Sequence, residues 1–123
     1  MKRLIFDLDD TISFTENSNY KDAKPNLPLI EKMWEYKRKG FEIIIATSRN
    51  MRTYSGSIGK INAHTLPVII TWLKSNNVPY DEIITGKPWC GFEGFYIDDK
   101  AIRPDEFIAL EFDQIRQLLK GGL

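Results

Sequence analysis

The stretch that decides the fold of this chain lies near its N-terminus and reads Leu4-Ile5-Phe6-Asp7-Leu8-Asp9-Asp10-Thr11. The apolar residues predict a short strand, and three carboxylates follow it within four positions. Carboxylates this close repel one another, so a chain tolerates them mainly where a cation or a developing positive charge is bound. Asp7 and Asp9 are separated by one residue, so on an extended backbone they point the same way and can share one metal ion or one phosphorus centre.

The composition predicts a single globular domain over residues 1–123, in which 42% of residues are hydrophobic and 28% are charged. Lys plus Arg and Asp plus Glu both number 17, and this balance argues against nucleic acid as the main partner. Cys90 is the only cysteine, which fits a reducing compartment. No apolar run reaches the length of a membrane span, and the N-terminus turns polar too soon for a secretory signal. We therefore expect a cytoplasmic protein without a membrane partner.

Strands alternate with helices in the hydrophobic pattern. The predicted strands cover residues 3–6, 41–46, 82–85 and 94–97, and the predicted helices cover 29–39, 65–77 and one or two pieces of 104–120. Polar loops are expected at 13–28, as a flap, and at 49–62. This alternation predicts an α/β fold, a three-layer sandwich in which helices cover both faces of a Rossmann-like, mostly parallel sheet.

Polar groups follow every predicted strand. They are Asp7 and Asp9, then Thr47-Ser48-Arg49, then Lys87, and last Asp98-Asp99. Because a parallel sheet gathers the carboxyl ends of its strands at one edge, we expect these groups to form one site there.

The gathered groups suit phosphoryl transfer. Up to four carboxylates can hold Mg²⁺, which prefers hard oxygen ligands. Thr47, Lys87 and backbone N–H groups can bind a phosphate. Asp7 is then the expected nucleophile, forming an aspartyl-phosphate, and Asp9 is placed to protonate the leaving oxygen and later to deprotonate water.

At these positions the chain resembles the haloacid dehalogenase superfamily of phosphohydrolases. The four motifs of that superfamily occur here in order, as Asp7-Leu8-Asp9-Asp10-Thr11, Ile43-Ile44-Ile45-Ala46-Thr47, Lys87 and Asp98-Asp99. They span nearly the whole chain. The segments 46–52 and 87–91 look more narrowly like small phosphatases of capsular polysaccharide biosynthesis.

The resemblance implies a role for each matching residue. Asp7 would be nucleophile and metal ligand, and Asp9 would be acid/base and would bind Mg²⁺ through its carbonyl. Asp98 would be a direct metal ligand, and Asp99 would act directly or through water. Thr47 and Lys87 would bind the phosphoryl group. The gaps between motifs leave no room for a cap domain, so the site is expected to be open or covered by a neighbouring subunit in a homo-oligomer.

The substrate implied by the narrower resemblance is a small phosphorylated sugar or related metabolite. A nucleic-acid 3′-phosphate is the second choice, and a protein phosphate is the third. Ser48 and Arg49 are candidate substrate contacts. The pliable 49–62 loop, the 13–28 flap or a neighbouring subunit is expected to close the site.

Other interpretations of the same residues were weighed. A calcium loop is disfavoured because Ile12 stands where an EF-hand needs glycine. A receiver domain, which accepts phosphate without being an enzyme, would place its lysine after both acidic clusters, whereas Lys87 precedes Asp98. Asp10 is expected to be a turn or helix-cap residue, and His64 a helix-terminal or loop residue rather than a catalyst.

Overall fold

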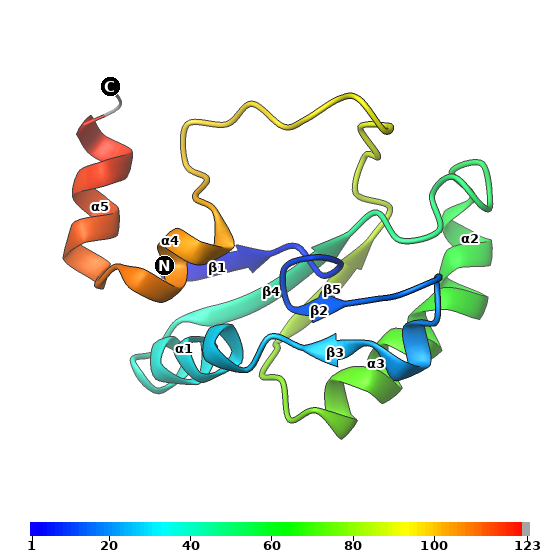
Figure 1. Cartoon of the computed structure of the whole chain (residues 1–123), viewed down its shortest axis with the longest axis horizontal. Helices are drawn as coiled ribbons and strands as arrows, with labels where there is room; N and C mark the ends of the chain where they lie inside the picture. The colour runs from blue at the N-terminus through cyan, green and yellow to red at the C-terminus, as the bar shows by residue number, and fades with distance from the viewer. Residues whose placement is uncertain (122–123) are drawn as a thin grey trace. The chain divides into compact units, whose positions relative to one another are not determined.

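The computed structural model describes residues 1–121 and divides the chain into two compact units, Met1–Trp89 and Cys90–Leu123 (Figure 1). Residues 122 and 123 of the predicted domain lie outside the described residues. The prediction of one domain stays a prediction. No helix of the described part of the chain combines the length and apolar character needed to cross a membrane.

The first unit is built on a parallel sheet of three strands, β1 (Arg3–Phe6), β4 (Glu42–Thr47) and β5 (Glu82–Thr85), in the order β1-β4-β5. Ile5 pairs with Ile44, and Ile45 pairs with Ile83. The predicted α/β class with a parallel sheet is confirmed, and the arrangement is compatible with a Rossmann-like sandwich. The three predicted strands of this unit form within one residue of their expected bounds.

The core is centred on β4, whose residues Ile43, Ile44 and Ile45 are fully buried. An unbroken apolar run suits a strand that is covered on both faces, as the sequence predicted. The edge strand β1 is different, because its side chains alternate in environment. Phe6 is buried, whereas Ile5, which points to the opposite face, is 67% exposed.

Helices α1 (Leu27–Arg38) and α3 (Leu66–Ser75) supply most of the remaining core of this unit. Helix α1 buries four residues at helical spacing, Leu29, Ile30, Met33 and Tyr36. It ends at Arg38, two residues before Gly40, whose φ of +91° is the left-handed conformation expected just past a helix. Both helices carry a proline in the first turn, where the missing N–H costs nothing.

The 13–28 segment is not the irregular flap that the sequence predicted. It contains a small antiparallel sheet of β2 (Ser13–Phe14) and β3 (Lys24–Pro25), with the 3₁₀ turn η1 (Tyr20–Asp22) between them. The indole N–H of Trp72 donates to the carbonyl of Ala23 at 2.9 Å and ties the segment to α3. Short strands paired only with each other carry too little hydrophobic pattern to be recognised from sequence.

The 49–62 segment was predicted as a loop, but helical structure begins inside it, at α2 (Ile58–Lys60). It continues through the π-helical turn η2 (Ile61–Thr65) into α3. The signal was present as a series of residues four apart that are all buried, Ile61, Thr65, Ile69 and Leu73. Gly56 and Gly59 obscured it, because glycines normally indicate a loop.

The second unit contains α4 (Pro104–Ala109) and α5 (Phe112–Gly121), which confirms helical structure over 104–120, where one or two pieces were predicted. The strand predicted at 94–97 is wrong, since these residues belong to no strand in residues 1–121. They lie in a long irregular stretch between β5 and α4 (Figure 1). Their local preference for extended structure is present, but a strand also needs a neighbouring strand to complete its hydrogen bonds.

Asp81 stabilises the edge of the sheet at which β4 and β5 begin. Its carboxylate accepts hydrogen bonds from the Lys37 ammonium and, at 2.8 Å, from the backbone N–H of Ile43. The Lys37 hydrogen bond, followed by that of Ile43, holds the pKa of Asp81 below its ordinary value of 3.8. The ionised carboxylate is therefore the form that the folded state prefers.

We expect folding stability to fall as the pH drops below about 4, because a carboxylate with a lowered folded pKa stabilises the protein only while ionised. Asp81→Asn should remove this contribution and cost about 1–2 kcal/mol at neutral pH. Urea denaturation at pH 7 and pH 3 measures both effects. The loss caused by Asp81→Asn should shrink at pH 3, and an equal loss at both values would show that the charge of Asp81 is not what stabilises the fold.

Candidate active site

Three strand ends of the first unit meet at one edge of the sheet. Asp7 follows β1, Thr47 ends β4, and Lys87 follows β5 after Gly86. The backbone N–H of Lys87 donates to the Thr47 carbonyl at 3.1 Å, so the last two lie side by side. Gly86 has a φ of +82°, a left-handed conformation that strains other residues, so the turn that presents Lys87 favours glycine.

Asp7 is held between a cation and a hydroxyl. The Lys87 ammonium donates to one carboxylate oxygen at 3.3 Å, and the Thr11 hydroxyl donates to the other at 3.2 Å. The Asp7 side chain remains 38% exposed, so an incoming group can reach it. Asp7 and Lys87 are therefore in contact, as the predicted strand order leads one to expect.

The turn after β1 fixes the direction of both carboxylates. The carbonyl of Leu8 accepts the N–H groups of Thr11, Ile12 and Ser13. The side chains of Leu8 and Ile12 are buried in the core, so Asp7 and Asp9, on either side of Leu8, point outward. Asp10 has a φ of +63°, which confirms that it is a turn residue.

Asp9 is bound by Arg49 through two hydrogen bonds. Arg49 Nη2 donates to one Asp9 oxygen at 2.7 Å, and Arg49 Nε donates to the other at 3.1 Å. The guanidinium carbon lies 4.1 Å from the ring centre of Tyr20, which belongs to η1. Arg49 is only 6% exposed, so this planar cation is fixed between a carboxylate and an aromatic ring.

Tyr20 is the residue that sequence reasoning missed. It reaches Arg49 from the segment between β2 and β3, and it lies 29 positions away in the sequence. No local sequence motif predicts a contact between residues so far apart in the sequence. The Nη1 atom of Arg49 is buried and has no hydrogen-bond partner among the described residues, a cost of about 1–3 kcal/mol that favours a functional reason for the arrangement.

Thr47 is buried, and its hydroxyl accepts the backbone N–H of Arg49 at 3.1 Å. In this conformation its side chain fixes the turn after β4 rather than facing solvent. Ser48 is half-buried beside it. Phosphate binding by these two residues, and substrate binding by Arg49, stay predictions.

The loop beyond Arg49 is tied down by side-chain hydrogen bonds. The Thr65 hydroxyl donates to Asn50 Oδ1, and the Thr85 hydroxyl donates to Asn62 Oδ1, both at 2.6 Å. His64 is exposed in η2, with its ring 5.9 Å from that of Tyr54. This candidate lid therefore has fixed points at both ends.

Asp98 and Asp99 belong to the second unit, where both are exposed. Asp98 accepts the backbone N–H of Lys100 at 2.8 Å. Across residues 1–121, no three His, Cys, Asp or Glu side chains are grouped closely enough to hold a metal ion. The first unit offers the partly exposed Asp7 carboxylate, and such hard oxygens fit Mg²⁺, which often takes only one or two protein ligands. Metal binding by the Asp9 carbonyl stays a prediction.

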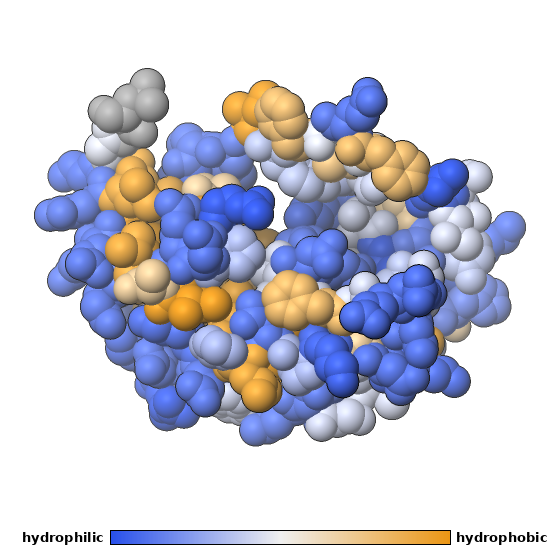
Figure 2. All heavy atoms as spheres, in the orientation of Figure 1, coloured by the Kyte–Doolittle hydropathy of each residue, from blue (hydrophilic) through white to orange (hydrophobic). Residues whose placement is uncertain are grey.

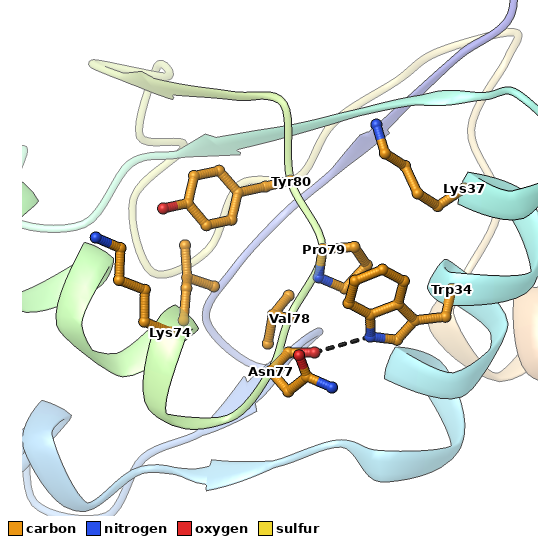
Figure 3. Close-up of a pocket in the computed structure, with 8 residues that line it drawn as sticks. Trp34, Lys37, Lys74, Asn77, Val78, Pro79 and Tyr80 are labelled. Atoms are coloured by element: carbon orange, nitrogen blue, oxygen red, sulfur yellow. Dashed lines mark hydrogen bonds between the residues drawn. The ribbon is translucent and has the colours of Figure 1, made fainter.

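Two cavities among the described residues lie away from these groups. One of about 340 Å³ is lined by Trp34, Lys37, Asn77 and Tyr80, among others, where α1 and α3 end (Figure 3). Trp34 Nε1 donates to the Asn77 carbonyl across it at 2.8 Å. It lies before the start of β5, whereas Lys87 follows the end of that strand, so we assign it no part in the chemistry.

The fold and this edge of the sheet define an α/β protein with charged groups at the carboxyl ends of parallel strands. The chain is 54% identical to a Vibrio cholerae protein of known crystal structure, with a TM-score of 0.97 over 100% of both chains. It belongs to the same family as that protein. A chain from the structure of the Pnkp1/Rnl/Hen1 complex is 21% identical with a TM-score of 0.53, which shows a shared fold alone. That match covers 68% of this chain and 27% of the other. No family model and no curated protein matches the sequence.

Proposed function

We propose that the protein is a Mg²⁺-dependent phosphomonoester hydrolase of the haloacid dehalogenase type that works through an aspartyl-phosphate. The observation that carries this proposal is the arrangement of Asp7. Its carboxylate is partly exposed at the end of β1, and the Lys87 ammonium lies 3.3 Å away. A nucleophile at that point would have a cation beside it to bind the anionic phosphoryl group.

The proposed reaction has two steps. In the first, an Asp7 oxygen forms a bond to phosphorus, the bond from phosphorus to the leaving oxygen breaks, and Asp9 gives that oxygen a proton. In the second, Asp9 takes a proton from water, the water oxygen attacks phosphorus, and Asp7 leaves with the release of inorganic phosphate. Arg49 keeps the Asp9 carboxylate in a fixed orientation in both steps.

The metal ion would be held by Asp7, by the Asp9 carbonyl and by Asp98 with Asp99. When bound, Mg²⁺ neutralises the charge of an anionic nucleophile that approaches an anionic phosphate. A small phosphorylated sugar is the proposed substrate class, with surface polysaccharide biosynthesis as its setting. A panel of sugar phosphates, 3′-phosphorylated oligonucleotides and p-nitrophenyl phosphate tests this, since turnover of the oligonucleotides alone would favour the nucleic-acid alternative.

We expect phosphatase activity to require Mg²⁺ and to be lost in excess chelator. Asp98→Ala should raise the Mg²⁺ concentration needed for half-maximal rate by about tenfold or more, and Asp99→Ala should have an equal or milder effect. Asp105→Ala, which removes an exposed carboxylate from the same unit, is the matched control and should leave this concentration unchanged. Full activity of the wild-type protein in chelator would contradict the metal requirement.

A further inference from the structure

The first unit holds a cavity of about 340 Å³ at the edge of the sheet where β5 begins, whereas the candidate active site lies where that strand ends. Its walls come from α1, from the C-terminal part of α3 and from residues 77–80, which connect α3 to β5 (Figure 3). All three segments belong to the first unit, so the cavity is formed within one compact body. Cavities of roughly 300–1,000 Å³ bind small molecules. Hydrophilic side chains predominate at the surface over α1 and α3 in Figure 2, which favours a small polar ligand over an apolar partner surface.

An aromatic side chain forms part of each of two walls. Trp34 comes from α1 and Tyr80 from the stretch before β5, and both are half-buried. The indole N–H of Trp34 donates to the Asn77 carbonyl at 2.8 Å, so the orientation of this ring is fixed before any ligand arrives (Figure 3). Fixed aromatic faces stack on flat rings. The cavity therefore suits a ligand that contains a planar ring.

The side chain of Asn77 offers a donor and an acceptor next to Trp34. Asn77 closes the C-terminal end of α3 with a φ of +52°, a left-handed conformation that glycine most often supplies. Glycine would therefore meet the backbone requirement without an amide, and the Asn77 amide has no hydrogen-bond partner among the described residues. An asparagine amide both donates and accepts, so it can pair at once with N7 and with the N6 amino group of adenine.

The charge of the walls favours an anion. Two lysines and no carboxylate line the cavity. Lys37 is paired with Asp81, which lies outside the lining, whereas Lys74 is exposed and forms no ion pair among the described residues. The Lys74 carbonyl accepts the Asn77 N–H at 3.2 Å, so the ammonium and the amide belong to the same end of α3. An ammonium of this kind binds phosphate as a point charge.

We infer that this cavity binds a free adenine mononucleotide, with the base against Trp34, its N6 and N7 edge at Asn77 and its phosphate at Lys74. The equal numbers of basic and acidic residues, 17 of each, argue against a nucleic-acid strand as the source of the nucleotide. Because the cavity lies at the opposite end of β5 from Lys87, the nucleotide is a bound ligand and not the substrate of the candidate active site. The inference goes beyond the proposed function and does not depend on it.

The indole N–H signals of the three tryptophans test this binding in a proton–nitrogen correlation NMR spectrum of the labelled wild-type protein. Trp34→Phe and Trp89→Phe assign the two signals that matter, since each variant lacks one of them. Adenosine 5′-monophosphate (AMP) is titrated in excess chelator, so that the proposed hydrolysis cannot consume it. We expect AMP to shift the Trp34 signal saturably and inorganic phosphate alone to leave it in place. Adenosine, which lacks the phosphate, should bind at least about tenfold more weakly than AMP.

Two variants separate the contact to the base from the contact to the phosphate. Asn77→Gly keeps the left-handed turn and removes the amide, and inosine 5′-monophosphate (IMP) carries a carbonyl in place of the N6 amino group. The wild-type protein should prefer AMP over IMP by about fivefold or more, and Asn77→Gly should abolish this preference. Lys74→Ala should weaken the binding of AMP about tenfold and leave that of adenosine unchanged. Lys24→Ala, which removes an exposed lysine from β3, is the matched control and should bind both ligands as wild type does.

The absence of a saturable shift of the Trp34 signal up to about 10 mM AMP would overturn the inference. A shift confined to Trp89 would overturn it as well, because Trp89 lies two residues beyond Lys87 and reports on the candidate active site. The same holds for a preference for AMP over IMP that survives in Asn77→Gly, for equal weakening of AMP and adenosine by Lys74→Ala, and for tighter binding of a short oligoadenylate than of AMP. A wild-type protein without phosphatase activity would remove the proposed function and leave each of these results as it is.

Discussion

Asp7→Asn is expected to lower kcat at least about 1,000-fold, because an amide oxygen cannot form the aspartyl-phosphate. The side chain keeps its size, and Thr11 can still donate to its oxygen. The fold should therefore persist, which the far-UV circular dichroism spectrum and a thermal melt will show. Initial rates on the best substrate of the panel, at saturating Mg²⁺, measure the effect.

Asp10→Asn is the matched control for this variant, since it makes the same chemical change three positions away. Asp10 is exposed and has a φ of +63°, a conformation that asparagine adopts readily. We expect its rate to stay within about twofold of wild type. Retention of more than a few per cent of the rate by Asp7→Asn, or an equal loss in Asp10→Asn, would contradict a covalent role for Asp7.

The sequence predicted the parts of this fold that local pattern determines. The buried strand Ile43-Ile44-Ile45, the cap at Gly40 and the approach of Lys87 to Asp7 all follow from hydrophobic runs, glycine placement and strand order. The α/β class followed from the same pattern because alternating strands and helices have few ways to bury their apolar faces.

The features that the sequence did not predict depend on partners distant in the chain. Residues 94–97 have the preference for a strand but no neighbouring strand among the described residues. The helical start at Ile58 depends on the burial of Ile61. The nearby glycines favoured a loop, so the sequence did not indicate this helix. The contact of Asp9 with Arg49 spans 40 positions, and it follows from the folded sheet rather than from any motif.

That contact supports a further role for Arg49, whose predicted substrate contact stays a prediction. The guanidinium is buried against Tyr20 and gives two hydrogen bonds to Asp9. We interpret Arg49 as a positioning residue that acts through Asp9. Its planar fork holds both carboxylate oxygens, which a lysine cannot do, so Arg49→Lys should be impaired almost as much as Arg49→Ala.

Asp9→Asn should lower kcat/KM for an alkyl phosphate by about 100- to 10,000-fold, because the departing alkoxide needs a proton. The loss should be much smaller for p-nitrophenyl phosphate, whose leaving group departs without one. If Arg49 acts through Asp9, then Arg49→Ala should show the same dependence on the leaving group. The double variant should be no slower than Asp9→Asn alone, since two residues that act as a unit are not additive.

Additive losses in the double variant, or equal losses on both substrates, would instead assign Arg49 to direct phosphate binding. Tyr20→Phe and Tyr20→Ala test what the aromatic ring contributes to the position of the Arg49 guanidinium. Phenylalanine keeps the ring that lies 4.1 Å from Arg49 and should behave as wild type, whereas alanine removes it. Tyr20→Ala should therefore lower kcat/KM for the alkyl phosphate more than for the aryl phosphate, because a guanidinium without its ring no longer fixes the carboxylate that moves the proton.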